Sequence, residues 1–279
     1  NLQRDPDAND TRNTGGTYQV DNSALSTGTT APTINADRNA VTRWAKKLES
    51  AAALDILQWG VEQFGTKLTF ATGFGPEGCV LIDLISRNHL KVDVFSLDTG
   101  LLFDESYELW RNLEEHYDVK IRGVVPIQSV DAQAAVHGDS LWERAPDQCC
   151  ELRKVMPLRN ELSKVDAWIT AIRREQTAQR ANAPVVEWDA KFGIAKINPL
   201  VRWTKKEVWS HILKYQVPYN PLHDRGYPSI GCTPCTSTVK SGEDDRAGRW
   251  RGVAKTECGL HGPVVPMVEQ SKVPRDTEA

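Results

Sequence analysis

The sequence lacks any long hydrophobic run, so it predicts no membrane-spanning helix. No apolar stretch among its 279 residues approaches the roughly 18 consecutive residues that a span needs. The chain also opens without the charged and then apolar segment of a secretory signal. Without such a signal, 6 cysteines predict free thiols in a reducing compartment rather than a disulfide framework. We therefore expect a cytoplasmic protein with no membrane partner.

The sequence also lacks the basic surplus that is typical of nucleic-acid-binding proteins. Lysines and arginines number 34 against 37 aspartates and glutamates, which gives a formal net charge of −3. We therefore expect no nucleic-acid partner. A hydrophobic fraction of 40% is enough to bury a substantial core, and the length allows one large domain or two.

Residues 1–38 have few large apolar side chains. Asn, Asp, Thr, Ser and Gly dominate this segment, and they bury too little surface to offset chain entropy, so we expect disorder. Asp5, Asp7 and Asp10 fit poorly with an acid-poor transit peptide. A plastid location stays open only if a transit peptide has been removed before Asn1.

From residue 41 onward, helix-like and strand-like segments alternate. Apolar residues at three- and four-residue steps predict helices, and short apolar runs predict strands. The expected helices span 41–48, 50–64, 79–85, 104–117 and 208–216, and the expected strands span 67–72, 92–98, 119–125 and 167–172. This alternation predicts an α/β fold with a single doubly wound, mostly parallel sheet flanked by helices. Residues 185–198 are expected to form a hairpin-like excursion.

Specific residues mark two of the helix boundaries. Ser50 is a candidate N-cap for the second helix, and Gly65 is placed to end it. Thr204 and Glu207 form a capping box that opens the helix 208–216. Four apolar residues at this helix are expected in the core rather than on a binding face: Trp203, Val208, Trp209 and Ile212.

Polar residues stand at the ends of three expected strands: Thr72, Asp98–Thr99 and Arg173–Arg174. In a parallel sheet these ends share one edge, where ligands bind. The glycine turn 73–78 follows the first strand and opens a helix, an arrangement that points backbone N–H groups at a phosphate. A plain strand-to-helix turn is the alternative reading. Cys79, just beyond the turn, is expected to be a small buried hydrophobe.

Two cysteine pairs lie far apart in the chain. Cys149 and Cys150 are adjacent, and Cys232 and Cys235 form a C-x-x-C pair. Four thiolates can close around one metal centre, and an iron–sulfur site, a structural zinc site or unliganded thiols are all open at this point. Because neighbouring helical positions differ by about 100°, both sulfurs of the first pair can face one centre only with local distortion.

Cys258 stands outside both pairs. Lys255 and His261 lie close to it in the chain, and nearby cations favour the reactive thiolate. The residue is therefore a candidate nucleophile. The alternative is an inert surface cysteine near a frayed terminus.

Six motifs in this order resemble one family, the assimilatory adenylyl-sulfate reductases, which are relatives of the phosphoadenylyl-sulfate reductases. The resemblance runs from about Leu68 to His261. It rests on Leu97-Asp98-Thr99-Gly100, Cys149-Cys150-x-x-Arg153-Lys154-x-x-Pro157-Leu158, Arg173-Arg174-x-Gln176, Gly231-Cys232-x-Pro234-Cys235-Thr236, Arg246-x-Gly248-Arg249-Trp250 and Glu257-Cys258-Gly259-Leu260-His261.

The resemblance implies an adenine nucleotide alpha-hydrolase-like fold, a cofactor and a substrate. In such enzymes the two cysteine pairs hold a 4Fe–4S cluster, here Cys149, Cys150, Cys232 and Cys235. The phosphoadenylyl-sulfate branch typically lacks these four cysteines, so adenylyl sulfate is the expected substrate. A phosphoadenylyl-sulfate reductase or a dual-specificity enzyme is the alternative. The implied reductant is thioredoxin.

The resemblance also implies a mechanism. The Cys258 thiolate attacks the sulfur of adenylyl sulfate and expels AMP, and a thioredoxin thiol then frees sulfite from the S-sulfocysteine. Attack on an anionic substrate needs charge compensation. Lys154, Arg246, Arg249 and His261 resemble the phosphosulfate-facing cations, and Arg173 and Arg180 add to them. The remaining expected substrate-binding residues are Thr72, Gly73, Phe74, Gly75, Glu77, Leu97, Asp98 and Thr99.

The chain departs from the family pattern at the glycine turn. Many cluster-bearing members carry Ser-x-Ser-Gly-Ala-Glu-Asp there, whereas this chain has Thr72, Phe74 and Gly78 at the two serine positions and the aspartate position. The family often has an arginine directly after Leu-Asp-Thr-Gly, where this chain has Leu101. It also often has a glycine shortly before the Arg-Arg pair, where this chain has Ala171. A cluster-bearing tRNA-thiolating ATPase is a more distant alternative, but its Ser-Gly-Gly-x-Asp-Ser turn is absent. A non-enzymatic metal-bound sensor is another.

These observations divide the chain into three parts: a disordered segment 1–38, a nucleotide-binding reductase domain 39–241 with the cluster site, and a C-terminal segment 242–279 with the nucleophile. We expect the last part to be flexible, because Cys258 must reach both substrate and thioredoxin. Too little chain follows His261 for a glutaredoxin-like domain, which favours an external reductant. The oligomeric state, including a homo-oligomer, is open.

Overall fold

The computed structural model describes residues 38–255 and 257–261. The predicted disorder of residues 1–38 falls outside this part except at Arg38, which begins the helix α1 Arg38–Leu48, so the prediction is wrong at that residue. Residues 262–279 of the segment predicted to be flexible also lie outside it. One six-stranded sheet has the order β3-β2-β1-β4-β6-β5. Its strands are β1 Leu68–Thr72, β2 Asp93–Leu97, β3 Ile121–Val124, β4 Ala167–Ile169, β5 Val186–Asp189 and β6 Ile194–Ile197. All neighbours are parallel except β5 and β6, so the predicted single, mostly parallel sheet is confirmed.

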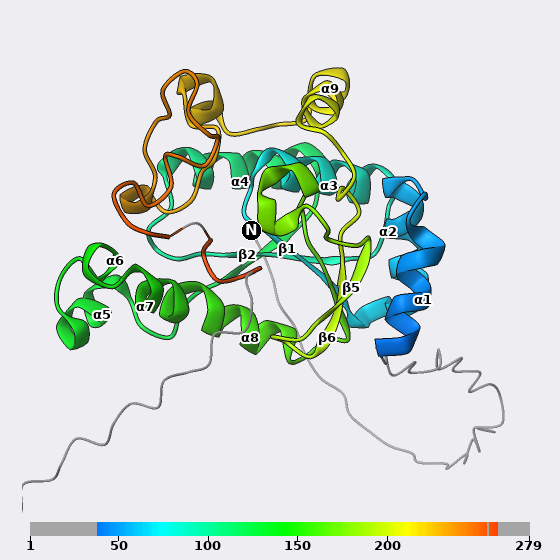
Figure 1. Cartoon of the computed structure of the whole chain (residues 1–279), viewed down its shortest axis with the longest axis horizontal. Helices are drawn as coiled ribbons and strands as arrows, with labels where there is room; N and C mark the ends of the chain where they lie inside the picture. The colour runs from blue at the N-terminus through cyan, green and yellow to red at the C-terminus, as the bar shows by residue number, and fades with distance from the viewer. Residues whose placement is uncertain (1–37, 256, 262–279) are drawn as a thin grey trace, which may run out of the picture. The chain divides into compact units, whose positions relative to one another are not determined.

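Helices cover the sheet in layers (Figure 1). The α-helices are α1 Arg38–Leu48, α2 Ala53–Phe64, α3 Pro76–Arg87, α4 Asp104–Tyr117, α5 Val130–His137, α6 Leu141–Arg144, α7 Pro146–Cys150, α8 Met156–Leu162 and α9 Lys205–Tyr215. Shorter 3₁₀ turns are Gly65–Lys67, Arg174–Gln176, Ala178–Arg180, Pro221–Arg225 and Thr233–Cys235, and Glu151–Val155 is a π-helical turn. Helices α3 and α4 lie on one side of the strands, and α7 and α8 lie on the other.

The strands bury side chains on both faces of the sheet. On one face, Phe70 and Ile169 belong to a large apolar cluster with residues of α2, α3 and α4. On the other, Phe95 and Trp168 pack with Leu158 of α8. Strands buried on both faces need a nearly continuous apolar sequence, which is why short apolar runs located them. This packing holds the carboxyl ends of β1, β2 and β4 at one edge.

The helix boundaries test the local sequence signals. Gly65 ends α2 as predicted, with φ of 51° and its N–H bonded to the Val61 carbonyl oxygen. The prediction that Ser50 caps α2 is wrong, because the helix starts two residues later behind Ala52, which makes no side-chain cap. Ser50 thus lies two residues before the N-cap position, too early for its short side chain to reach the first free N–H groups.

The region after β4 confirms the predicted hairpin and adds a connection. Strands β5 and β6 pair antiparallel, and β6 also pairs parallel with β4, so the hairpin extends the main sheet. The capping box before α9 is present in full between Thr204 and Glu207. Val208 and Ile212 are buried in the core as predicted, whereas Trp209 is partly exposed and also lines a cavity. No helix within the described ranges is long and apolar enough to cross a membrane.

Removing the α9 capping box should lower stability measurably. Thr204→Ala deletes the hydroxyl that accepts from the Glu207 N–H, and loss of such a cap costs about 1 kcal/mol. Ser50→Ala is the matched control, because Ser50 is exposed and does not cap α2. Thermal unfolding should show a lower Tm for Thr204→Ala only. Equal shifts for both variants would contradict the assignment of the cap.

Candidate active site

Two adjoining cavities lie at the carboxyl edge of the sheet. The first, here the thiol cavity, has a volume of about 200 Å³ and is lined by Thr72, Gly73, Phe74, Leu97, Thr99, Lys154, Trp168, Arg249, Cys258 and His261 among others. The second, here the arginine cavity, has a volume of about 530 Å³ and is lined by Gly73, Gly75, Glu77, Arg173, Arg180, Arg246, Arg249 and His261 among others. The structure therefore brings nearly all the expected nucleophile and substrate-binding residues to one place.

The glycine turn after β1 gives the thiol cavity one wall. Phe74 has a φ of 57°, a left-handed conformation that is uncommon for a residue with a side chain. Its ring is buried and packs 5.2 Å from Trp110, measured between ring centroids. Its N–H donates to Thr72 Oγ1 at 3.1 Å. A Cβ on Gly78 would lie 2.7 Å from the same oxygen, so this position has no room for the family's aspartate.

The turn after β2 separates the roles of Leu97, Asp98 and Thr99. Leu97 and Thr99 line the thiol cavity. The Asp98 carboxylate accepts hydrogen bonds from the Tyr107 hydroxyl at 2.6 Å and the Gly100 N–H at 3.0 Å. Asp98 is not among the described residues that line either cavity. In this structure its carboxylate shapes the turn, whereas the sequence placed it with the substrate contacts.

The first cysteine pair ends α7, and a π-helical turn follows at once. Pro146 occupies the first turn of α7, as the sequence predicts. The turn Glu151–Val155 supplies the local distortion expected near adjacent cysteine ligands. Buried Arg153 donates to the Thr99 carbonyl oxygen at 2.6 Å and to Gln133 Oε1 at 3.2 Å, which ties this turn to the end of β2. Lys154, the next residue, lines the thiol cavity.

The second cysteine pair reaches the first through backbone contacts with the β2 turn. Cys232 pairs with Leu102 in an isolated β-bridge, and its sulfur lies 3.3 Å from Thr99 Oγ1. All of the cysteines are free thiols. Burial raises the pKa of Cys149 and Cys235, and the charge of Cys232 raises both further. Burial likewise raises the pKa of Cys150 to about 11, with Cys232 again contributing.

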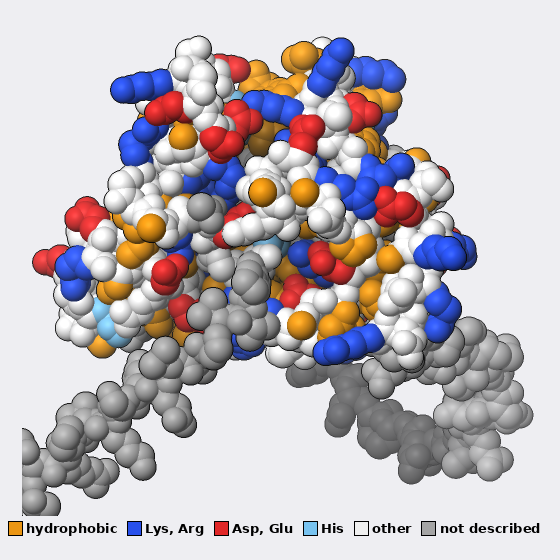
Figure 2. Space-filling view, viewed as in Figure 1, with side chains coloured by type: hydrophobic (Ala, Val, Ile, Leu, Met, Phe, Trp, Pro, Cys, Tyr) orange, Lys and Arg blue, Asp and Glu red, His pale blue; other side chains and the backbone are white. Residues whose placement is uncertain are grey.

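Lys154 and Arg249 supply positive charge beside Cys258 in the thiol cavity. Burial opposes the charge on Lys154, but Cys232, Cys258 and Cys150 outweigh it and raise the pKa of this lysine. Arg249 has its pKa lowered, chiefly by burial, and its guanidinium lies 4.5 Å from the Trp250 ring centroid. Its Nη1 donates to the Ile230 carbonyl oxygen at 3.3 Å. Basic side chains also show in the recess between the C-terminal loops and α9 (Figure 2).

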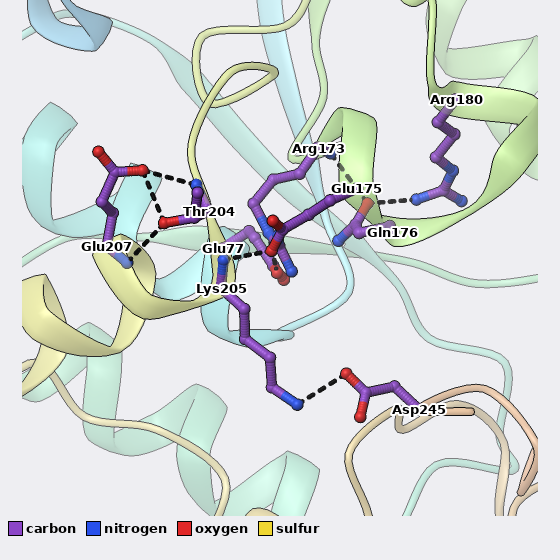
Figure 3. Close-up of polar contacts among 9 residues, drawn as sticks. All are labelled: Glu77, Arg173, Glu175, Gln176, Arg180, Thr204, Lys205, Glu207 and Asp245. Carbon is purple, nitrogen blue, oxygen red and sulfur yellow. Dashed lines mark hydrogen bonds and ion pairs between the residues drawn. The ribbon is translucent and has the colours of Figure 1, made fainter. Parts of the chain in front are cut away.

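Arg173 and Arg180 belong to a polar network on one wall of the arginine cavity (Figure 3). Buried Arg173 donates from Nε to Glu77 Oε1 at 2.7 Å and also pairs with Glu175. Gln176 Oε1 accepts from the Arg173 N–H at 2.9 Å and from Arg180 Nη1 at 2.6 Å. Glu77 thus serves as a counter-charge for Arg173.

The C-terminal segment 257–261 packs into the same edge. Glu257 pairs with Arg180 and Arg246, and Lys191 Nζ donates to the Gly259 carbonyl oxygen. The His261 ring stacks on Trp168, with centroids 5.6 Å apart and planes at 15°. In Figure 1 this orange-to-red chain lies between the α3–α4 layer and the α7–α8 layer.

Sequence reasoning missed three contributors to the site. The apolar pattern predicted Trp168 as a core residue of a strand, but its ring also stacks against the His261 ring. Glu257 and Gln176 stand within quoted motifs, but nothing in their spacing indicated that they bind the cavity arginines. Only the contact between segments far apart in the chain reveals these roles.

Comparisons with known proteins agree on the family. Residues 67–238 match the model of the phosphoadenosine phosphosulfate reductase domain. The chain is 48% identical over 215 residues to adenosine 5'-phosphosulfate reductase of Halalkalibacterium halodurans, covering 77% of this chain and 93% of that protein. It is 49% identical over 210 residues to adenosine 5'-phosphosulfate reductase 1 of Bacillus subtilis, covering 75% and 90%.

A solved structure supports the same assignment. The phosphoadenylyl-sulfate (PAPS) reductase from Candida auris, in a phosphate complex, is 35% identical, with a TM-score of 0.64 over 74% of this chain and 99% of that one. The fold is an α/β protein with one mostly parallel sheet, and the partly buried Cys258 lines a cavity at its carboxyl edge. The chain belongs to the phosphoadenosine phosphosulfate reductase family.

Acid should release the segment that carries Cys258. Burial first, and then the charges of Lys196, Arg180, Arg246 and Lys191, hold the pKa of His261 well below its ordinary 6.5. A released imidazole takes up a proton near that ordinary pKa, whereas the docked one does not. Docking is therefore fully stable above about pH 6.5 and weakens below it, by up to about 1.4 kcal/mol per pH unit.

Hydrogen exchange of a peptide covering residues 257–261, corrected for intrinsic rates, measures this effect. Protection should fall between about pH 6.5 and 5.5, because the docked His261 resists protonation. His261→Phe is the control, since it keeps a ring to stack on Trp168 without a titrating group. Protection that falls equally in His261→Phe would show that another group is responsible.

Proposed function

We propose that this protein is an adenosine 5'-phosphosulfate reductase that releases sulfite and AMP in sulfate assimilation. The observation that carries the proposal is the thiol cavity, where Cys258 shares a surface with Lys154 and Arg249 next to the glycine turn. A nucleophilic sulfur beside fixed cations at the carboxyl edge of a parallel sheet suits attack on an anionic nucleotide. Relatives at about 48% identity that bear this name support the same substrate.

The chemistry proceeds in two displacements. The Cys258 thiolate donates its electron pair to the sulfur of adenosine 5'-phosphosulfate, the sulfur–oxygen bond breaks, and AMP leaves with that bond's electrons. Cys258 then carries a sulfonate as S-sulfocysteine. A thiol of a thioredoxin-type reductant attacks the Cys258 sulfur, sulfite leaves, and a mixed disulfide forms. The reductant's second thiol resolves this disulfide, so two thiols supply both electrons.

Charge compensation makes the first displacement feasible. Both reactants carry negative charge, and their repulsion grows in a water-poor cavity. Lys154 and Arg249 meet the developing charge from side chains already fixed by burial and packing, so little reorganisation accompanies the reaction. Thr72, Phe74 and Leu97 form the rest of the wall that would hold the nucleotide.

The two cysteine pairs fit an iron–sulfur cluster as donors. Their four thiols are unpaired, and all are soft ligands of the kind that iron–sulfur centres take. Within the described residues no three His, Cys, Asp or Glu side chains converge as they would around a single metal ion. A 4Fe–4S cluster would take these four thiolates as its soft ligands. Cys149, Cys150, Cys232 and Cys235 would hold it, and its positive irons would lower the cost of placing thiolates at these buried and partly buried positions.

A resident cluster would contribute electrostatic stabilisation and rigidity rather than electrons. Lys154 follows Cys150 by four residues and lines the thiol cavity, so this chain connects the cysteine site to the substrate cations directly.

The proposal includes thioredoxin as reductant and a cytoplasmic location. A phosphoadenylyl-sulfate reductase is the second candidate, favoured only by the family name and the Candida auris relative. Turnover with each nucleotide decides between them.

Cys258→Ser should abolish sulfite release from adenosine 5'-phosphosulfate with thioredoxin. A serine hydroxyl is a far weaker nucleophile, and a sulfate ester on its oxygen lacks the divalent sulfur that a reductant thiol attacks to release sulfite. Sulfite assay of steady-state turnover is the measurement. Cys79→Ala, which removes a buried thiol that lines neither cavity, should keep its activity. Sulfite formation by Cys258→Ser would refute the proposed nucleophile.

Cys235→Ser should lose iron and inorganic sulfide together. Replacing one thiolate leaves one iron of the proposed cluster without its soft ligand. Metal and sulfide analysis of protein purified without oxygen is the measurement, with Cys79→Ala again as control. Zinc in the wild-type protein, or unchanged iron in Cys235→Ser, would contradict the cluster assignment.

A further inference from the structure

Glu257, the residue before Cys258, is a buried carboxylate between two arginines. Its side chain is 9% exposed. Arg180 Nη2 lies 2.9 Å from its carboxylate, and Arg246 Nη2 lies 3.3 Å from it. These guanidinium groups are themselves only 11% and 20% exposed. Both arginines line the arginine cavity. Glu257 therefore connects two cations of this cavity to the backbone next to Cys258.

The cations of the site divide according to their partners. Arg173 is neutralised by Glu77 and Glu175. Arg180 and Arg246 both pair with Glu257. Across residues 38–255 and 257–261, no carboxylate lies within ion-pair distance of Lys154 or Arg249. These two therefore stay available to an anionic substrate while Glu257 is docked.

We propose that Glu257 is a positioning residue that holds Cys258 in the thiol cavity, an inference that rests on the proposed function. Neighbouring Cα atoms are about 3.8 Å apart, so fixing the Glu257 side chain confines the nucleophile within a short radius. Arg180 and Arg246 then act twice: they hold the nucleophile's neighbour and face the arginine cavity. Positioning and substrate binding are coupled through the same two guanidinium groups.

Other contacts anchor the segment without reaching these cations. Lys255 pairs with Asp147 of α7, and Lys191 binds the Gly259 carbonyl oxygen. Neither Lys255 nor Lys191 is among the described residues that line a cavity. Among the described ion pairs, those of Glu257 with Arg180 and Arg246 therefore connect the arginine cavity most directly to Cys258.

Competition is the opposite reading, in which Glu257 occupies the arginines in place of the substrate anion. Its removal would then tighten nucleotide binding and preserve the rate. The charge count favours positioning, because Lys154 and Arg249 keep two positive charges free of carboxylates in the cavity that contains Cys258. The two readings predict opposite effects of one substitution.

Glu257→Gln tests the inference with little change of shape. In single turnovers with saturating adenosine 5'-phosphosulfate, sulfonate formation on Cys258 should slow by about 10- to 100-fold, the scale of a small misplacement of reacting atoms. The dissociation constant of the nucleotide should change less than about threefold, since Lys154 and Arg249 are intact. Glu257→Asp should recover part of the rate.

Glu243→Gln is the matched control. Glu243 pairs with Arg251 in the same C-terminal part of the chain, and it lies outside the lining of both cavities. Its removal should leave the single-turnover rate unchanged. An unchanged rate in Glu257→Gln, or tighter binding at full rate, would overturn the positioning role.

A double-mutant cycle separates positioning from a general charge effect. Arg180→Met should slow sulfonate formation in the wild-type background and add little in Glu257→Gln, because both substitutions break the same contact. Fully additive losses would overturn the inference.

A readout without chemistry distinguishes failure of this inference from failure of the proposed function. Hydrogen exchange of residues 257–261 in the nucleotide-free protein should accelerate in Glu257→Gln and stay unchanged in Glu243→Gln. Should the wild-type protein form no sulfonate adduct, the proposed function fails, and the exchange data still test the anchoring. Unchanged exchange in Glu257→Gln would overturn the anchoring whatever the substrate.

Discussion

Positive charge held at the carboxyl edge of the sheet is the constraint on which the rest of the site depends. Taking a cation out of water costs several kcal/mol unless a partner compensates it. The fold meets that cost unevenly. Arg173 pairs with two carboxylates, and Arg180 and Arg246 both pair with Glu257. By contrast, Lys154 has the sulfurs of nearby cysteines as opposing charges. The unevenness leaves positive charge where a nucleotide anion would lie.

Segments that are far apart in the sequence supply the side chains at this edge. The π-helical turn after Cys150 presents Lys154, and Arg153 beside it binds the end of β2. The C-x-x-C loop joins the same strand end through the bridge from Cys232 to Leu102. The Cys258 segment therefore docks on groups that the sheet already holds.

Much of the fold was predictable because strands buried on both faces leave an unmistakable apolar signature. The capping box at Thr204 was predictable too, since its partners stand three residues apart. The prediction for Ser50 was wrong because the backbone geometry, and not the presence of a polar residue, decides which residue is the N-cap of α2. The pairing of β6 with β4 depends on contacts across about 30 residues, which local patterns do not encode.

The site was predictable as a set of residues and not as an arrangement. Motifs named Lys154, Arg246 and Cys258, but their spacing could not show which cation faces a carboxylate and which faces a thiol. Asp98 illustrates the limit, because the strand-end rule located it correctly while its carboxylate turned out to bond Tyr107. Side-chain direction is decided by packing, and packing involves the whole chain.

The central claim is that the Cys258 sulfur receives a sulfonate from a nucleotide held beside fixed cations. Its most direct test is incubation with adenosine 5'-phosphosulfate in the absence of reductant, followed by intact mass measurement and peptide mapping. The account predicts one sulfonate per chain, located on Cys258, and one equivalent of AMP. A sulfonate on another cysteine, or AMP released with no adduct, would contradict it.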